Sequence, residues 1–259
     1  MGRVICIANQ KGGVGKTTTA INLAASIGAQ EQRVLLVDLD PQANATSGLG
    51  ETRDESNINV FQSMLGFHPI HLAIKHTAFA NVDLIPSSGD LIGAEIALIS
   101  REDRDELLRR ALHSIRDRYA FVLLDCPPSL GLLTVNALTA AQGVLAPVQA
   151  EYYAMEGLSQ LLTTVERVRE VLNPELEIDG VLLTMYDPRN NLARQVEQEL
   201  RAQLGDRVFA TLIPRNVRLS EAPSFGKPAL YYDVRSSGAQ AYQALARELL
   251  TRSHGAAPA

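Results

Sequence analysis

The chain of 259 residues has a net charge of -5 and is 46% apolar and 20% charged, which is typical of a globular protein with a substantial core. This composition excludes a chain that is disordered or coiled-coil throughout. The longest apolar runs are too short to span a bilayer, and the N-terminus lacks the basic region and apolar stretch of a signal peptide. The acidic balance excludes a uniformly basic coat for nucleic acid, so any DNA binding requires a local patch.

The apolar runs that alternate with amphipathic stretches predict strands at residues 4–8, 34–37, 82–85, 121–124, 144–148, 180–184 and 208–213. Helical spacing predicts helices at residues 17–29, 101–118, 155–172, 192–204 and 239–251. The polar residues 40–59 predict a long functional loop. Continuous apolar strands separated by helices are typical of an α/β fold with a doubly wound, mostly parallel sheet and helices on both faces. We therefore expect one domain over residues 1–252, a disordered tail at 253–259, and a ligand at the carboxyl ends of the strands.

Cysteine and lysine usage gives two further indications. Cys6 and Cys126 each lie in an apolar run, and two buried thiols favour a reducing cytoplasm. The 24 basic residues include only four lysines, and two of these, Lys11 and Lys16, lie in one glycine-rich loop. This sparing use of lysine suggests that the two have a function that arginine does not supply.

That loop, residues 9–18, follows the first predicted strand and opens the first predicted helix. Its glycines let several backbone N–H groups face one anion, and the helix N-terminus adds partial positive charge. Lys16 can then reach the β- and γ-phosphates of a nucleotide, and the Thr17 hydroxyl can ligate Mg²⁺. The general phosphate-loop pattern has glycine where this chain has Gln10. The loop predicts nucleotide contacts by Gly12, Gly13, Val14, Gly15, Lys16, Thr17 and Thr18.

Two other predicted strands are followed by carboxylates. Asp125 comes directly after the strand at 121–124, where it can hold Mg²⁺ itself or through water. Asp38 and Asp40 follow the strand at 34–37, and a carboxylate there can position water for attack on the γ-phosphate. On these residues alone, either motif could be an ordinary acidic turn.

Four segments carry a specific resemblance: KGGVGKTT at 11–18, VDLDPQ at 37–42, DCPPS at 125–129 and IPRNVRLSEAPS at 213–224. Together they resemble the ParA/MinD family of deviant Walker-A ATPases, most closely its Soj-type chromosome-partitioning members. The resemblance covers nearly the full chain, and Gln10 is acceptable in this family. It implies a P-loop NTPase fold, ATP and Mg²⁺ as ligands, slow hydrolysis of ATP to ADP and phosphate, and a homodimer when ATP is bound.

The resemblance also implies roles in hydrolysis. Lys11 is expected to reach across a dimer to the phosphates held by the other subunit. Lys16 is expected to bind phosphates in its own subunit, and Asp40 to orient the hydrolytic water.

The resemblance also implies which residues bind the metal ion and which contact the adenine base. Thr17 is expected to hold Mg²⁺, with Asp125 behind a ligating water and Asp38 supporting the metal shell. Pro214 and Asn216 are expected to contact adenine.

Arg189 and Arg218 match positions that the family uses for non-specific binding of double-stranded DNA. Two phosphate contacts per subunit give about four per dimer and a salt slope near -3.6. Charge alone favours reading these arginines as ordinary surface ion pairs. The resemblance further implies stimulation by a ParB-type centromere-binding protein, a cytoplasmic and nucleoid-associated location, and a role in chromosome or plasmid segregation.

Three other functions compete with this one. A membrane-cycling, MinD-like division-site ATPase needs a basic amphipathic C-terminal helix, but Glu248 opposes Arg247 and Arg252 there, so we expect no membrane partner. A metal-cluster carrier needs closely spaced cysteines, and Cys6 and Cys126 are far apart in the sequence. A small-molecule kinase needs an acceptor pocket, whereas paired lysines in a phosphate loop indicate self-association.

Overall fold

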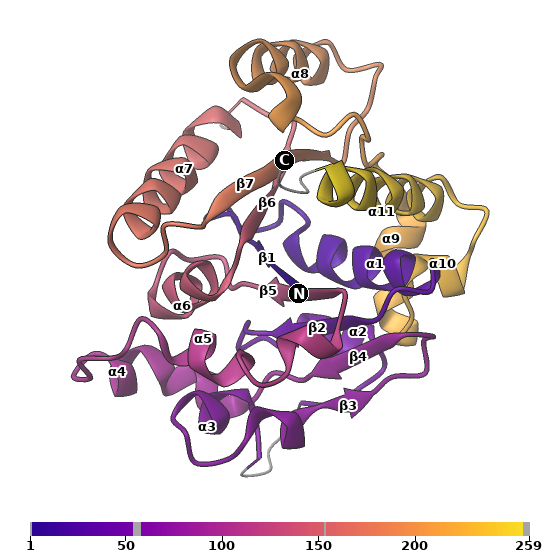
Figure 1. Cartoon of the computed structure of the whole chain (residues 1–259). Helices are drawn as coiled ribbons and strands as arrows, with labels where there is room; N and C mark the ends of the chain where they lie inside the picture. Colours follow the sequence, from indigo (N-terminus) through magenta and orange to yellow (C-terminus); the bar gives the residue numbers. More distant parts are fainter. Residues whose placement is uncertain (1, 54–57, 153, 256–259) are drawn as a thin grey trace.

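A twisted sheet with the strand order β3-β4-β2-β5-β1-β6-β7 forms the centre of the protein (Figure 1). The structure is a computed structural model and describes residues 2–53, 58–152 and 154–255. Within these residues the sheet has seven strands, all parallel except the antiparallel edge strand β3, so the expected sheet is confirmed. The strands are β1 (Arg3–Ile7), β2 (Val34–Asp38), β3 (Lys75–His76), β4 (Val82–Ile85), β5 (Phe121–Asp125), β6 (Gly143–Gln149) and β7 (Glu177–Thr184).

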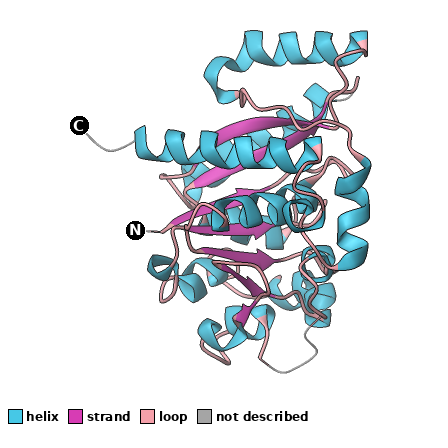
Figure 2. Cartoon of the chain, turned by 90° about the vertical axis from the view of Figure 1, so that its right-hand side faces the viewer, coloured by secondary structure: helices cyan, strands magenta, loops and turns pink. Residues whose placement is uncertain are grey.

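Helices cover both faces of the sheet, as predicted (Figure 2). Alternate residues of each strand face opposite sides, so β1 sends Cys6 into one apolar cluster and Ile5 into the other. The Cys6 side packs on α3 (Val60–Met64), α4 (Ala94–Leu98), α5 (Leu107–Leu112), α6 (Leu132–Ala140), α7 (Ala154–Val171) and α8 (Asn191–Leu204). The Ile5 side packs on α1 (Lys16–Gly28), α2 (Asn44–Gly48), α9 (Val217–Glu221), α10 (Ala229–Tyr232) and α11 (Ser237–Gly255).

The strand register brings the carboxyl ends of the central strands together. Asp125 of β5 lies between Ile7 of β1 and Asp38 of β2. The loop that leaves β1 and the two carboxylates therefore meet at one edge of the sheet, where a doubly wound fold binds its ligand.

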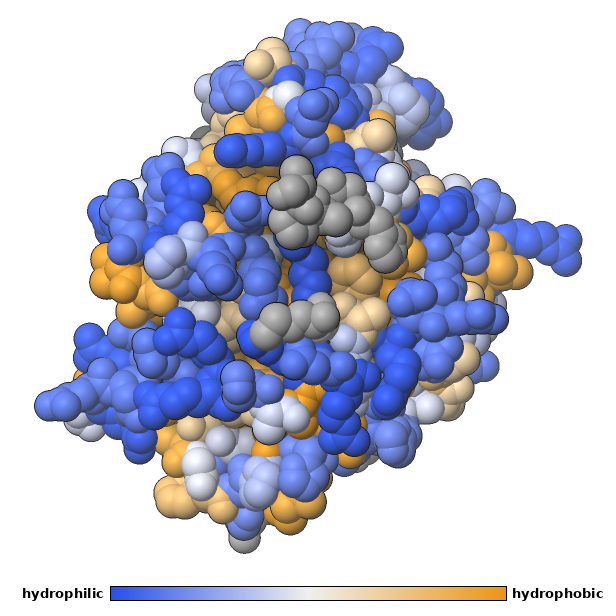
Figure 3. Space-filling model, viewed as in Figure 1, coloured by the Kyte–Doolittle hydropathy of each residue, from blue (hydrophilic) through white to orange (hydrophobic). Residues whose placement is uncertain are grey.

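The apolar side of the last helix, α11, is buried in the protein. Tyr242, Leu245 and Leu249 are each at most 1% exposed and belong to the same cluster as α1. The face of the molecule seen in Figure 3 is mostly hydrophilic, with apolar side chains in small separate groups. Of the helices in the described ranges, none combines the length and the apolar character that crossing a bilayer needs.

The predicted helix at 101–118 is wrong in extent, because only α5 and a 3-10 turn at Arg116–Arg118 form. A continuous helix would bond the N–H of Leu108 to the carbonyl of Arg104. The Asn136 amide of α6 lies between these groups instead: it donates to the Arg104 carbonyl at 2.6 Å and accepts from the Leu108 N–H at 3.2 Å. The Asn136 side chain thus takes the place of the helical hydrogen bond between residues 104 and 108, and α5 begins only at Leu107.

The predicted strand at 208–213 is also wrong. This segment runs along the outer edge of β7, and its Phe209 and Ile213 N–H groups donate to the Val181 and Leu183 carbonyls at 3.0 and 2.9 Å. It forms no regular ladder: the bridges are isolated, Val181 with Val208 and, just beyond both segments, Tyr186 with Pro214. Between them, the N–H groups of Ala210 and Thr211 donate to the Glu248 carboxylate of α11 at 2.8 and 2.9 Å. Because that carboxylate takes two N–H groups, the strand ladder is interrupted.

Two boundaries differ from expectation as well. The polar stretch 40–59 contains the helix α2, while residues 54–57 of that stretch lie outside the described residues. The last helix runs to Gly255, so residues 253–255 are helical where we expected a disordered tail. Residues 256–259 of the expected tail lie outside the described residues.

Candidate nucleotide site

The phosphate loop joins β1 to α1 and is anchored on two neighbouring strands. Asn9 donates its amide to the Pro147 carbonyl of β6 at 2.7 Å and accepts the Lys11 N–H at 2.9 Å. Thr184, the last residue of β7, donates its hydroxyl to the Val14 carbonyl at 2.7 Å. The sequence analysis missed both anchors, because each depends on strands that are distant along the chain.

The loop curls through left-handed backbone at two glycines. Gly13 has φ 75° and Gly15 has φ 90°, a region that glycine adopts without strain. Gly15 caps α1 without any side-chain hydrogen bond to the first turn. The N–H groups at the start of α1 are therefore free to face an anion, as a phosphate site requires.

The Lys16 side chain folds back over the loop, and its Nζ donates to the Lys11 carbonyl at 3.1 Å. It is only 6% exposed. Burial lowers the pKa of this amine, while the nearby Asp125, Cys126 and Asp40 oppose that effect. The loop thus holds a poorly hydrated ammonium at the point where phosphate charge would arrive.

Asp125 is the carboxylate that fits a cation. It is fully buried, and within the described residues neither oxygen has a protein partner at hydrogen-bond geometry. Burial first, and then the neighbouring Asp38, raise the pKa of Asp125 well above its usual range; the Thr17 hydroxyl and Lys16 lie near enough to counter part of this rise. A buried, unpartnered carboxylate beside a threonine hydroxyl suits Mg²⁺, which takes few protein ligands and keeps several waters.

Asp38 is already engaged by the protein. One of its oxygens accepts the Asp40 N–H at 3.1 Å, and the other accepts both the N–H and the hydroxyl of Thr46 at 2.8 and 2.7 Å. Burial raises the pKa of Asp38 to about 6, against the effect of these hydrogen bonds. Asp38 therefore has less freedom than Asp125 to take a ligand, and it organises the chain that carries Asp40.

A cavity of about 770 Å³ lies over this edge of the sheet. It is lined by the phosphate loop at Gly12, Gly13, Gly15, Lys16, Thr17 and Thr18, by Asp40, and by Pro214 and Asn216. Its size suits a nucleotide. One cavity is therefore surrounded by residues that are distant in the sequence and that we expected to bind phosphate, to act in hydrolysis and to contact adenine. Val14, Asp38 and Asp125 are buried.

Lys11 lies apart from this cavity. Its Nζ forms an ion pair with Glu151 at 3.0 Å, and it lines a hollow of about 210 Å³ with Gln10 and Glu156. The sequence analysis did not find Glu151.

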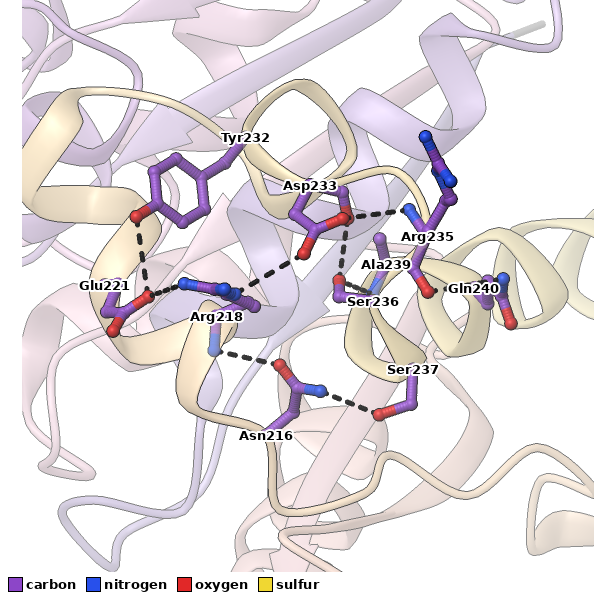
Figure 4. A network of polar contacts seen from close by, with 10 residues as sticks. All are labelled: Asn216, Arg218, Glu221, Tyr232, Asp233, Arg235, Ser236, Ser237, Ala239 and Gln240. Atoms are coloured by element: carbon purple, nitrogen blue, oxygen red, sulfur yellow. Dashed lines mark hydrogen bonds and ion pairs between the residues drawn. The ribbon is translucent and has the colours of Figure 1, made fainter.

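Both arginines expected to bind DNA are paired with carboxylates. Arg189, whose side chain is 89% exposed, makes a two-pronged contact with Asp187 at 3.0 and 2.8 Å. Arg218 lies between Glu221 at 2.7 Å and Asp233 at 3.4 Å, with its guanidinium over the Tyr232 ring (Figure 4). Only two residues before Arg218, Asn216 caps α9 by accepting the Arg218 N–H, and its amide donates to Ser237 at 2.7 Å.

The parallel sheet, the glycine loop between β1 and α1, and the aspartates at the ends of β2 and β5 define a P-loop NTPase. The model of the AAA domain family matches residues 2–178. The chain is 51% identical over 258 residues to the chromosome partitioning protein ParA of Myxococcus xanthus, covering 100% of this chain and 91% of that protein. It is 53% identical over 249 residues to the sporulation initiation inhibitor protein Soj of Bacillus subtilis, covering 96% and 98%. The chain therefore belongs to the ParA/Soj family of chromosome-partitioning ATPases, which confirms the resemblance noted in its sequence.

Among solved structures, the fold is similar to cobyrinic acid a,c-diamide synthase from Mycobacterium smegmatis with a bound ATP analog and magnesium. The TM-score is 0.86 at 38% sequence identity, and the alignment covers 99% of this chain and 98% of that one. This similarity confirms the expected P-loop NTPase fold.

Proposed function

We propose that this protein is a Mg²⁺-dependent ATPase that switches DNA binding on and off during chromosome or plasmid segregation. The observation that carries the proposal is that the phosphate loop, Asp40, Pro214 and Asn216 line one and the same cavity. The full-length identity to ParA and Soj relatives supports the partitioning role.

In the proposed mechanism, the phosphate loop binds ATP through its N–H groups and Lys16. Asp40, which is 7% exposed and lines the cavity, accepts a hydrogen bond from the water that attacks the γ-phosphate. Thr17 and Asp125 would hold Mg²⁺, which would supply positive charge to neutralise the phosphates. Pro214 and Asn216 contact the adenine.

ATP is proposed to join two subunits face to face. Lys11 then gives up its ion pair with Glu151 and binds the phosphates held by the other subunit. Both side chains are substantially exposed, at 37% and 48%, so breaking this pair costs about 1 kcal/mol or less. The switch needs ATP to bind the dimer better than the monomer.

DNA binding is proposed to depend on Arg189 and Arg218 of both subunits. One subunit contributes about two phosphate contacts, and a dimer doubles that number, so dimerisation strengthens binding without changing any single contact. The carboxylates beside each arginine must release it before it contacts a phosphate. Hydrolysis, stimulated by a ParB-type partner, would separate the subunits and release the DNA. While bound to DNA, the protein would be associated with the nucleoid.

The test is binding to random-sequence duplex DNA without nucleotide, with ADP and with ATP, across a salt series. Wild type and Asp40→Ala are compared, and hydrolysis is measured in parallel. We expect binding only with ATP, a salt slope near -3.6, and longer-lived complexes with Asp40→Ala. Normal ATP turnover in Asp40→Ala would remove Asp40 from the mechanism, and absence of DNA binding in every state would refute the switch.

The membrane-cycling alternative predicts ATP-dependent sedimentation with anionic liposomes. We expect none, because the apolar side of α11 is packed against the protein and is not available to a bilayer.

A further inference from the structure

Three buried side chains, the backbone N–H of Ser87 and the backbone N–H and carbonyl of Asp40 form a closed ring of hydrogen bonds. Asp38 accepts from the Thr46 hydroxyl at 2.7 Å, and that hydroxyl oxygen accepts the Ser87 N–H at 3.0 Å. The Ser87 hydroxyl donates to the Asp40 carbonyl at 2.7 Å, and the Asp40 N–H returns to Asp38 at 3.1 Å. We refer to Asp38, Asp40, Thr46 and Ser87 as the β2–β4 ring.

The ring joins three elements that are separate along the chain. Asp38 ends β2, Thr46 lies on α2, and Ser87 follows β4, the strand that neighbours β2 in the sheet. Asp38, Thr46 and Ser87 are fully buried, and Asp40 is 7% exposed. Each bond therefore forms away from competing water, and a buried group that loses its partner leaves the other unsatisfied.

The ring fixes the peptide of Asp40 from both sides. Its N–H is held by Asp38 and its carbonyl by Ser87, so only the side chain keeps freedom to point into the cavity. That side chain is steadied in turn, because its Oδ1 accepts the Gln42 N–H at 2.9 Å.

We propose that Ser87 and Thr46 are positioning residues for ATP hydrolysis, which fix Asp40 where it orients the attacking water. This inference rests on the role of Asp40 given under Proposed function. Neither residue has a part in holding the phosphates, because the loop is anchored separately by Asn9 and Thr184. Loss of the ring should therefore slow hydrolysis and leave ATP binding intact.

The expected size of the effect follows from geometry. Without the Ser87 hydroxyl, the Asp40 carbonyl keeps only the Ala43 N–H, at 2.9 Å, and loses its link to the segment after β4, so we expect the backbone at Asp40 to shift. A displacement of about 1 Å in a positioning group costs about 100-fold in rate. We expect kcat to fall about 10- to 100-fold in Ser87→Ala, with the KM for ATP within about twofold of wild type.

The chain offers matched controls for each substitution. Ser88 lies next to Ser87 and is 1% exposed, but within the described residues its hydroxyl has no hydrogen-bond partner. Ser88→Ala therefore makes the same change in the same segment without breaking the ring. For the second position, Thr46→Val removes the hydroxyl and Thr46→Ser keeps it, while Thr139→Val removes a buried hydroxyl that is likewise unpartnered in the described structure.

The experiment measures kcat and KM for ATP, with the affinity for a non-hydrolysable ATP analog and the circular dichroism melting curve of each variant. We expect Ser87→Ala and Thr46→Val to lose kcat alone, Thr46→Ser to recover most of it, and both controls to behave as wild type. If Ser87→Ala does not fold, the Thr46→Val and Thr46→Ser pair decides by the same criterion.

Two results would overturn the inference, and they differ from failure of the proposed function. Equal kcat in Ser87→Ala and Ser88→Ala, or an equal loss in Thr46→Val and Thr46→Ser, would show that the ring does not position Asp40. Those results refute the positioning role of the ring only if Asp40→Ala, measured in parallel, has lost hydrolysis. Wild-type turnover in Asp40→Ala would instead refute the mechanism, and the inference with it.

Discussion

Replacing Asp125 by asparagine should stabilise the protein while it destroys nucleotide binding. The carboxylate is fully buried, and within the described residues its oxygens have no hydrogen-bond partner. The Thr17 hydroxyl and Lys16 offset only part of the cost of burying this charge, which is several kcal/mol for an unpaired ion, and a neutral amide of the same shape still leaves polar atoms unsatisfied. The net gain is about 2 kcal/mol, and the melting temperature should rise by about 4–8 °C for a domain of this size.

The gain should depend on pH in a defined direction. The pKa of Asp125 is raised in the folded protein above its unfolded value of 3.8, so the folded state holds the proton more tightly. The stability that comes from this proton is present below about pH 4 and is lost as the pH rises toward the folded pKa. The difference between Asp125→Asn and wild type should therefore be near zero at pH 4 and grow with increasing pH.

Calorimetry in EDTA, followed by a titration with ATP and Mg²⁺, measures both effects. Wild type should gain stability on adding the ligands, and Asp125→Asn should not. Asp83→Asn is the contrasting control, because that carboxylate is nearly buried but accepts bonds from Tyr119 and His76 at 2.8 and 2.7 Å and from Arg33 at 3.3 Å, so its loss should lower the melting temperature. An Asp125→Asn protein that melts below wild type without ligands at pH 7.5 would refute the reasoning.

Three further predictions concern the phosphate loop, the carboxylates beside Arg218 and the Glu248 carboxylate. Lys16→Ala removes the buried ammonium of the phosphate loop and should abolish ATP-dependent dimers; dimers of wild-type size in light scattering would contradict the phosphate-loop assignment. Glu221→Gln frees Arg218 from one of its two carboxylates, and ATP-dependent DNA affinity should rise about two- to fivefold in fluorescence anisotropy, while an unchanged affinity would argue against a DNA contact by Arg218. Glu248→Ala leaves two backbone N–H groups without their acceptor and should lower the free energy of unfolding in urea by about 1–3 kcal/mol; a change below 0.5 kcal/mol would mean that water replaces the carboxylate.

The sheet was predictable because its strands are buried on both faces. Val34–Asp38 and Phe121–Asp125 have every residue buried, and such strands appear in the sequence as continuous apolar runs. Helix α6 was missed for a related reason: it is apolar and buried nearly all round, so it lacks the one-sided spacing that predicts a surface helix. Where single side chains decide the backbone, as Asn136 and Glu248 do, local sequence carries no signal.

The candidate site, too, has a part that the sequence predicts and a part that it does not. The phosphate loop, Asp40 and Asp125 were predictable because each lies where a strand ends, and parallel strands end at one edge of the sheet. The β2–β4 ring was not, because Ser87 meets Asp40 only through the pairing of two strands whose order the sequence does not state. The sequence indicated surface ion pairs for Arg189 and Arg218 from charge alone, but their partners were not named, although Asp187 and Glu221 lie within three residues of them.

Residues 208–214 run along the outer edge of β7 without forming a regular strand, and this limits how the sheet can associate with other chains in crowded solution. A regular strand there would present a row of unpaired N–H and carbonyl groups to other molecules, which is a template for adding a strand from another chain. Residues 208–214 lie along that border instead, and the carboxylate of Glu248 accepts hydrogen bonds from two of their N–H groups. At the opposite border, β3 is only two residues long. Both borders of the described sheet therefore discourage the addition of strands from other chains.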